Sequence, residues 1–478
     1  MSYQVPQHID KDKIFIIKKS EINSRLDPKM ALYNQSVQHS LYPPVKLKSL
    51  LLSKPQYGAN EAGLVREHKE QARYIRITDI DENGLISLDE LGATVANLDV
   101  KYILNENDIV IARSGATVGK SYIHKLLPYT CVYAGYLIRF VVDSDKILPD
   151  YFFAYTQLNP YKEWVHAIQR PSAQPNINAE EYQSLEIPLP NLSKQQEIVD
   201  YINAAYTQKQ AKETEAQQLL DSIDGYLLKE LGITLPNLKA ELTDRVFYVN
   251  YSDLSNRLDP YYSLKCFQES FEAVHLGKYP VVSLKSLTTL ITSGITPKSG
   301  GDAYVDDKLN GIPFIRSGNI NIDGELDFND LPYIRPAIHK TIMKSSQVRK
   351  NDLMIAIVGA TIGQVGIYVF DNEANINQAI ALVRLKDGIN VEYVKELIKS
   401  SIGQLSLNRL KRPVARANIN LEEIATIQVV LPPYEIQQKI ANQIQTIRQQ
   451  AKVLQAEGKA ILEDAKRKIE QMIIGEKI

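Results

Sequence analysis

The chain has 478 residues, of which 44% are hydrophobic, with 55 Lys and Arg against 56 Asp and Glu. This length allows two or three domains with their own cores, and the ordinary apolar fraction excludes a disordered protein and predicts a soluble globular one. The net charge of −1 argues mildly against a nucleic-acid binder, which usually carries a basic excess, although a local basic cluster can still attract DNA.

The ends and the cysteines of the chain predict a cytoplasmic protein. The first residues, MSYQVPQHIDKDK, lack the apolar core of a signal peptide, and no run of 18 apolar residues predicts a membrane span. Cys131 and Cys266 lie at unmatched positions of the repeat described next, which argues against a disulfide framework and fits a reducing compartment. His and Cys show no metal-ligand spacing, so we expect no zinc site.

Three blocks of the first half return, in order, in the second half. SRLDP at 24–28 returns as NRLDP at 256–260, NDIVIARSGATVG at 107–119 as NDLMIAIVGATIG at 351–363, and NINAEEYQSLEIPLPNLSKQQEI at 176–198 as NINLEEIATIQVVLPPYEIQQKI at 418–440. The repeat is far longer than the roughly 20–50 residues of a solenoid unit. It therefore predicts a duplicated domain and pseudo-twofold symmetry.

The first copy is predicted over residues 1–190 as a mixed α/β domain. Short β-type runs dominate it, namely IFIIK, YIRITDI, GLISL, DIVIA and YLIRFVV, separated by turn signals such as Asn83–Gly84. The segment 150–168 is aromatic and more helical in pattern. The copy closes with the apolar strand SLEIPLP.

A long helix is predicted within residues 191–232. No proline and a single glycine occur from Ser193 to Leu231. Ser193 is predicted as the N-cap, with Gln196 completing a capping box, and Gly232 as the stop. A heptad-like seam runs through Ile198, Ile202, Ala205, Lys209, Lys212, Ala216, Leu219, Ile223 and Leu227.

The second copy is predicted over 233–433, and a second helix, from about 435 to 474, within 434–478. Its seam runs through Ile440, Ile444, Ile447, Ala451, Leu454, Gly458, Ile461, Ala465, Lys468 and Met472. Gly458 and Ala465 are small enough for close backbone approach. Each helix would be about 55–60 Å long, and pairing is the simplest way to bury both seams.

These elements predict an α+β fold with two duplicated mixed α/β domains separated by two long helices. Because the domains are duplicates and each helix leaves its domain in the same way, a twofold relation makes the pair an antiparallel coiled coil. The alternative is two independent helices, each capping one domain.

Two strings resemble catalytic motifs but lack residues that the chemistry needs. GATVGKS at 115–121 has three residues between its glycines where a phosphate-binding loop has four, and Gln364 replaces Lys120 in the second copy, which leaves a tight turn between strands as the interpretation. LPPY at 431–434 resembles a loop of adenine methyltransferases, but Leu431 cannot hold an amino group. No nucleophile elbow or triad pattern occurs. We expect no catalytic residue, metal or cofactor in this chain.

Three repeated loops are candidate DNA contacts, because Arg binds guanine or phosphate bidentately and Gln or Asn binds adenine. The loops before the closing strands contribute Arg170 and Gln174 in the first copy, and Arg409, Lys411, Arg412 and Arg416 in the second. The other two loops contribute Arg76 and Asp79, matched by Arg316 and Asn319, and Arg113 with Ser114, replaced by Ile357 and Val358. The alternative is that these are solvated loops that drifted after duplication.

The order of two variable domains, each closed by a long helix, resembles the specificity subunit of type I restriction–modification enzymes. NDIVIARSGATVGK, ANINQAIALVRL, NINAEEYQSLEIPLPNLSKQQEIV and LPPYEIQQKIA are similar to strings of that family, and the resemblance covers about residues 14–475. Its strongest part is the strand-Pro-x-x-x-x-Gln-Gln-x-Ile junction into each helix.

The resemblance implies that each target-recognition domain reads one half of a bipartite double-stranded DNA sequence. The helices would set the spacer between the halves and dock two modification subunits that use S-adenosylmethionine. Restriction subunits, where present, would add ATP- and Mg-dependent translocation and cleavage. Helix pairing and partner docking would fall to the seam residues Ile198, Ile202, Leu219, Ile223, Leu227, Ile440, Ile444, Ile447, Leu454 and Ile461.

Three alternatives remain open at this point. One is the specificity subunit of a methylation-only system. Another is a coiled-coil scaffold that binds proteins and has no DNA specificity. The third, a self-sufficient methyltransferase or nucleotide hydrolase, is disfavoured by the incomplete motifs.

Overall fold

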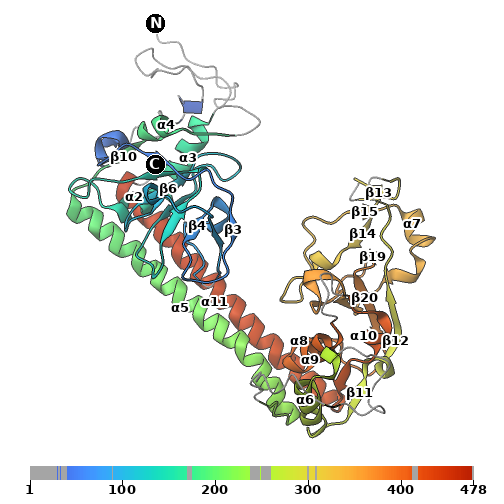
Figure 1. Ribbon diagram of the computed structural model, residues 1–478. Coiled ribbons are helices and arrows are strands. Elements are labelled where there is room, and N and C mark those ends of the chain that lie inside the picture. Colours follow the sequence, from blue (N-terminus) through green and yellow to red (C-terminus); the bar gives the residue numbers. More distant parts are fainter. Residues whose placement is uncertain are drawn as a thin grey trace. The chain divides into compact units, whose positions relative to one another are not determined.

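The structure is a computed structural model (Figure 1) that describes residues 29–30, 33, 40–88, 90–169, 175–236, 248, 260–298, 301–306, 309–411 and 418–475. The chain divides into two compact units. Unit 1 comprises Met1–Glu213 and Gln455–Ile478, and unit 2 comprises Thr214–Leu454. None of the helices in the described ranges is long and apolar enough to cross a membrane.

Within residues 40–188, the described part of unit 1 contains three small sheets and the short helices α2 (Pro149–Thr156), α3 (Asn159–Ile168) and α4 (Ala179–Gln183). One sheet is antiparallel, in the order β2 (Gln56–Tyr57), β9 (Leu137–Phe140), β6 (Ile109–Ala112), β7 (Ser121–Ile123). The next has the order β3 (Leu64–Val65), β5 (Ala93–Thr94), β4 (Arg73–Ile75), β8 (Cys131–Tyr133), in which β4 and β8 are parallel. β1 (Pro44–Lys46) pairs with β10 (Glu186–Pro188).

The core of unit 1 explains the aromatic segment 150–168, which forms α2 and α3. Tyr151, Tyr161 and Tyr182 are at most 1% exposed. Their hydroxyls donate to the backbone carbonyls of Pro188 (2.6 Å), Gly119 (2.8 Å) and Ala112 (2.8 Å), respectively. A buried tyrosine is tolerated where its hydroxyl has such a partner. These side chains therefore anchor α2 to β10, α3 to the turn between β6 and β7, and α4 to β6.

Unit 2 repeats this plan. Its antiparallel sheet has the order β12 (Thr288–Ser293), β20 (Ile380–Leu385), β17 (Leu353–Ala356), β18 (Val365–Ile367). A mixed sheet has the order β13 (Tyr304–Val305), β15 (Tyr333–Ile334), β14 (Ile312–Ile315), β19 (Ala374–Ile376), β16 (Gln347–Val348), and β11 (Val281–Ser283) pairs with β21 (Gln428–Val430). The short helices are α6 (Lys265–His275), α7 (Pro336–Lys340), α8 (Val391–Lys399), α9 (Ser401–Leu410) and α10 (Leu421–Ala425).

The repeated sequence blocks take the same local structure in the two units. β4 and β8 are parallel in unit 1, as are β14 and β19 in unit 2. Asn107 and Asn351 both adopt a φ of 69°, a left-handed conformation that asparagine tolerates better than most residues. Gly119 and Gly363, with φ of 87° and 94°, form the tight turns predicted from the glycine-rich strings. One difference is β16, which adds an edge strand to unit 2.

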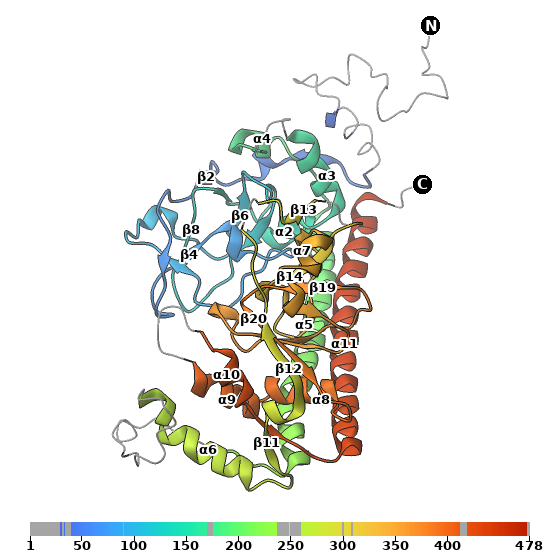
Figure 2. The ribbon, with the colours of Figure 1, turned by 90° about the vertical axis from the view of Figure 1, so that its right-hand side faces the viewer.

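Each unit also contains half of each long helix, α5 (Leu192–Leu231) and α11 (Tyr434–Ile474). In unit 1 the first half of α5 packs beside the last half of α11 (Figures 1 and 2), and Ile198 and Ile202 share a core with Leu462 and Ile469. In unit 2 the last half of α5 lies beside the first half of α11, joined by an ion pair of 2.9 Å between Lys439 and Glu230. Within each unit the two halves run in opposite directions.

The long helices differ in two places from the sequence-based expectation, at the cap of α5 and in the seam of α11. α5 begins at Leu192, and Asn191, not Ser193, is the cap, because the Asn191 Oδ1 accepts the Lys194 N–H at 2.9 Å. Near the end of α11, Lys468 is exposed and Ile469 is fully buried. The seam moves by one residue there because Ile469 joins the core of the unit 1 domain.

The middle of the pairing is close, as the small residue at 458 predicts. A Cβ added at Gly458 would lie 3.3 Å from the Lys209 carbonyl oxygen. The Lys209 side chain is 15% exposed and pairs with Glu213, and Lys212 pairs with Glu457 across the helices at 2.8 Å. A lysine stem can cover apolar surface while its ammonium group reaches water. The two lysines are therefore compatible with the seam.

The first glutamine of the Gln-Gln junction is a buried structural residue. In unit 2 the Gln437 side chain is 2% exposed, accepts the Asn390 N–H at 3.0 Å and donates to the Pro432 carbonyl at 2.8 Å. In unit 1 Gln195 makes the matching bonds to Leu148 and Pro190 (2.8 and 2.9 Å). Each glutamine thus ties the long helix to the start of a domain helix.

We expect Gln437→Leu to lower the free energy of unfolding of unit 2 by about 2 kcal/mol, because it leaves a buried carbonyl and a half-buried N–H without partners. Urea unfolding of the full chain, followed by hydrogen exchange in α8, measures this. Gln438→Leu is the matched control, since Gln438 is exposed. Equal effects of the two changes would contradict the role given to Gln437.

Candidate nucleic-acid interface

The repeated arginines Arg76 and Arg316 lie at equivalent edges of the two units. Each follows the strand that pairs in parallel, β4 or β14, and precedes a short 3-10 turn, Ile77–Asp79 or Ser317–Asn319. The next turn along this edge is held beside it by a backbone bond of 3.0 Å, from Ala134 N to Ile75 O in unit 1 and from Asn377 N to Ile315 O in unit 2. The edge therefore brings an arginine next to residues 134–136 in unit 1 and 377–379 in unit 2.

The two arginines differ in how they are held. The Arg76 guanidinium donates two hydrogen bonds to the Asp79 carboxylate, at 3.1 and 2.9 Å, and this bonding raises the pKa of Arg76. In unit 2 Asn319 replaces the carboxylate and accepts the Arg316 backbone N–H at 2.9 Å. Arg316 is exposed, and within the described ranges its guanidinium has no carboxylate partner. Its donors are thus available to a ligand.

Arg113 joins the same edge in unit 1. Its N–H donates to the Tyr136 carbonyl at 2.9 Å, and its guanidinium lies over the Tyr57 ring at 4.9 Å. Ser114 forms a bridge with Asn176. In unit 2 the matching Ile357 is 4% exposed and belongs to the core. The same position is therefore a partly exposed cation in unit 1 and a packing residue in unit 2.

The basic loop of unit 2 is described only at its start. The Arg409 Nε donates to the Tyr262 carbonyl at 2.9 Å, and the guanidinium lies 4.0 Å from the Tyr262 ring centre, so this side chain packs α9 within the unit. Lys411 donates to the Asn408 amide oxygen at 2.7 Å, and burial lowers its pKa. Arg170, Gln174, Arg412 and Arg416 lie outside the described residues. Their DNA contacts remain predictions.

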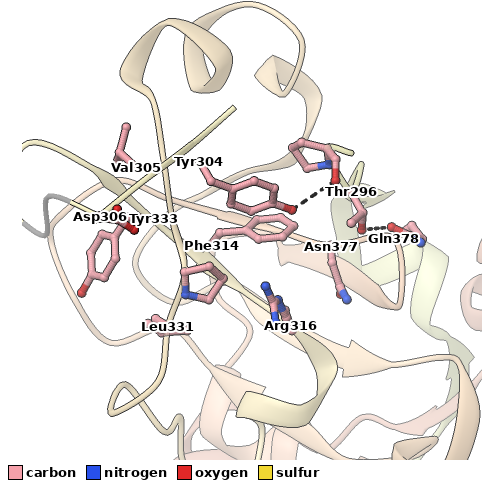
Figure 3. Close-up of a pocket in the computed structure, with 12 residues that line it drawn as sticks. Thr296, Tyr304, Val305, Asp306, Phe314, Arg316, Leu331, Tyr333, Asn377 and Gln378 are labelled. Carbon is pink, nitrogen blue, oxygen red and sulfur yellow. Dashed lines mark hydrogen bonds between the residues drawn. The ribbon is translucent and has the colours of Figure 1, made fainter. Parts of the chain in front are cut away.

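A cavity of about 650 Å³ opens beside Arg316 in unit 2 (Figure 3). Its walls combine aromatic and polar side chains, among them Thr296, Tyr304, Asp306, Phe314, Arg316, Tyr333, Asn377 and Gln378. The Tyr304 and Phe314 rings meet edge to face with centroids 6.1 Å apart. Arg316 and Asn377 lie on one side of these rings, and Asp306 and Tyr333 on the other (Figure 3). Such a cavity can hold a planar polar group against an apolar wall.

Asn377 and Gln378 were not among the residues chosen from the sequence. The sequence could have indicated them, because ANINQ in the second copy aligns with CVYAG in the first, so that Ala134 and Gly135 stand where Asn377 and Gln378 do. The structure adds that both amides line the cavity next to Arg316.

The sequence profile described as "Type I restriction modification DNA specificity domain" matches residues 62–221 and 277–463, which is most of the chain. The chain belongs to this family. This is the family that the residue patterns predicted, the specificity subunits of type I restriction–modification enzymes. The two matched regions fall on the two copies of the repeat.

Named specificity subunits are similar to parts of the chain. That of the type I restriction enzyme EcoBI of Escherichia coli is 36% identical over 143 residues, 30% of either chain. That of EcoKI of E. coli K12 is 20% identical over 72% of this chain and 68% of its own, and the putative MjaX subunit of Methanocaldococcus jannaschii is 26% identical over 41% and 48%. The chain thus spans less than half of the first and third of these relatives.

Solved structures of specificity subunits are also similar, at low identity. The crystal structure of the HsdS subunit from Thermoanaerobacter tengcongensis has a TM-score of 0.36 at 15% identity, covering 91% of this chain and 97% of that one. The type I restriction-modification S subunit from M. genitalium has a TM-score of 0.40 at 14% identity, covering 90% and 96%. A chain from a study of complex assembly in the type I system has a TM-score of 0.47 at 15% identity, covering 89% and 95%.

Proposed function

We propose that this specificity subunit is the non-catalytic DNA-recognition subunit of a type I restriction–modification complex, and that each α/β domain reads one half of a bipartite site. One observation carries the proposal. Duplicated domains hold different side chains at the same edge: Arg76 bound to Asp79 in unit 1, and Arg316 beside Asn377 and Gln378 in unit 2. Equal scaffolds with different base-contacting groups suit two half-sites of different sequence.

The long helices are proposed to form one antiparallel coiled coil that sets the spacer and docks two modification subunits. The opposite direction of the helix halves in each unit and the ion pairs across them support the pairing. Leu192 and Tyr434 support the docking. They occupy equivalent first positions of α5 and α11, and are 39% and 44% exposed. Repeated exposed apolar groups suit two copies of one partner.

Catalysis is proposed to reside in the partners. Modification subunits would bring S-adenosylmethionine, and restriction subunits, where the system has them, would bring ATP and Mg²⁺ chemistry. The glycine-rich strings support this division. They fold as turns that join strand to strand, β6 to β7 and β17 to β18, whereas a P-loop joins a strand to a helix.

A map of N6-methyladenine in source cells with and without this gene tests the proposal. We expect one asymmetric bipartite motif to lose methylation when the gene is deleted. Complementation with the intact gene is the control. A complemented, expressed and assembled complex that methylates adenine without sequence preference would contradict the proposal and favour a protein-binding scaffold.

A further inference from the structure

We propose that the cavity beside Arg316 recognises a guanine in the half-site read by unit 2. This inference rests on the proposed function and adds to it the chemical identity of one contacted base. It depends on which hydrogen-bonding groups of Arg316, Asn377 and Gln378 are already used within the protein and which remain for DNA.

The two amide oxygens at the cavity each accept a hydrogen bond from within the protein. The Asn377 Oδ1 accepts the Ala379 N–H at 3.2 Å, and the Gln378 Oε1 accepts the hydroxyl of Thr296. A backbone N–H can only donate, so the first bond fixes which end of the Asn377 amide faces outward. The outward group of Asn377 is therefore its NH₂ group. With its Oε1 bonded to Thr296, Gln378 presents its NH₂ group as the end of the amide without a partner among the described residues.

Arg316 adds a third set of donors to the same side of the cavity. Its backbone N–H is bonded to Asn319, while within the described ranges its guanidinium makes no hydrogen bond. In Figure 3 the Arg316 and Asn377 side chains lie next to each other. This side of the cavity consequently offers donors, and the ligand that fits it presents acceptors.

Guanine presents the richest acceptor edge of the four bases in the major groove, because both its N7 and its O6 accept hydrogen bonds. Adenine places a donor amino group beside N7, which would face the donors of Arg316. The bidentate pairing of an arginine with guanine is the commonest specific contact of this kind. The donor set therefore favours guanine over adenine.

Phosphate is the other acceptor that DNA offers, and Asp306 argues against it. Asp306 lines the opposite side of the cavity and is exposed. Its carboxylate would repel a phosphate. A G·C pair instead supplies the cytosine amino group, a donor that a carboxylate can accept.

The wall of the cavity is prepared for direct contact. The aromatic wall offers no competing polar group. Phe314 is apolar and fully buried against Tyr304, and the Tyr304 hydroxyl already donates to the Pro297 carbonyl at 3.2 Å. An apolar wall lowers the local dielectric and strengthens hydrogen bonds at its rim. Unit 1 lacks this donor set, since Ala134 and Gly135 stand in place of the two amides.

The test uses the full chain assembled with its modification subunits and duplexes carrying the site found by methylation mapping. Each guanine of that site is replaced in turn by 7-deazaguanine, which removes N7 and keeps base pairing and phosphates. The variants are Arg316→Met and Gln378→Met. Lys350→Met is the control of equal charge in the same unit, because exposed Lys350 pairs with Asp371 away from the cavity.

We expect one guanine, in one half-site, whose replacement weakens wild-type binding about ten- to a hundredfold. Arg316→Met should bind the natural site about as weakly and lose little more when that guanine is replaced. Arg76→Met should leave the sensitivity to that guanine unchanged.

Two outcomes would overturn the inference while leaving the proposed function intact. One is a uniform loss of affinity for all duplexes in Arg316→Met, with the reduced salt dependence of a lost phosphate contact. The other is the same sensitivity to every guanine replacement in Arg316→Met as in the wild type. A wild-type complex without sequence preference would instead contradict the proposed function itself.

Discussion

Seven residues inserted at facing positions of both long helices, after Glu213 and after Leu454, are expected to lengthen the DNA spacer by about three base pairs. Seven helical residues add about 10.5 Å at 1.5 Å per residue, and one base pair of DNA rises about 3.4 Å. Both insertions lie where unit 1 meets unit 2 along the chain, and near the facing pair Lys212–Glu457. A full heptad keeps the seam on the same side of each helix.

Methylation mapping measures the outcome, because it reports both half-sites and the distance between them. The half-sites should stay as they are, since no residue of either α/β domain changes. Insertion into α5 alone is the control, and it should abolish methylation by pulling the seam of one helix out of register with the other. If the double insertion is active and the spacer length is unchanged, the helices do not set the spacer.

Arg448→Leu is expected to lower the free energy of unfolding of unit 2 by about 3 kcal/mol. Arg448, on α11, lies 2.8 Å from Glu396 of α8, whose side chain is 4% exposed. Removing the arginine leaves a buried carboxylate with Lys395 at 3.3 Å and the nearby charge of Lys399. Losing one partner of a buried pair typically costs about 3–5 kcal/mol, and the remaining lysines put this case at the lower end.

Hydrogen exchange of the α8 amides in the full chain measures this change locally. Lys452→Met is the matched control on the same helix, because Lys452 and its partner Glu325 are both more than half exposed and such a pair contributes about 1 kcal/mol or less. If the α8 amides are equally protected from exchange in both variants, Arg448 is not the residue that holds α8 to the long helix.

The same pair predicts a dependence of stability on pH. Although burial raises the pKa of Glu396, the hydrogen bond and the charge of Arg448, together with the charges of Lys395 and Lys399, lower it more, so the pKa lies below its ordinary value. A carboxyl group with a lowered pKa contributes stability that is complete above its unfolded pKa, about 4.3, and is lost as the pH falls through the folded value. In Arg448→Leu this acid-induced loss should be smaller.

Residue patterns along the chain were sufficient to predict the repeat, the two long helices and the family. Heptad spacing and the absence of proline are local properties, so they located α5 and α11 within one or two residues. The glycine-rich turns were also predictable, because positive φ is a requirement of the backbone itself. The cap of α5 was placed two residues late, since Asn191 and Ser193 can both cap a helix.

What the candidate arginines contact depended on residues far away in the sequence, and only the tertiary structure decided it. The sequence made Arg409 a candidate DNA contact, and the structure adds that Tyr262, 147 residues away, accepts a hydrogen bond from it. The orientation of the Gln378 amide depends on Thr296, 82 residues away, whose hydroxyl bonds to the amide oxygen. By itself the sequence determined that the chain contains two copies of one domain plan, because repeats and periodicity can be read along the chain. It could not determine which hydrogen-bond donors each copy leaves free, because those donors bond to residues that only folding brings close.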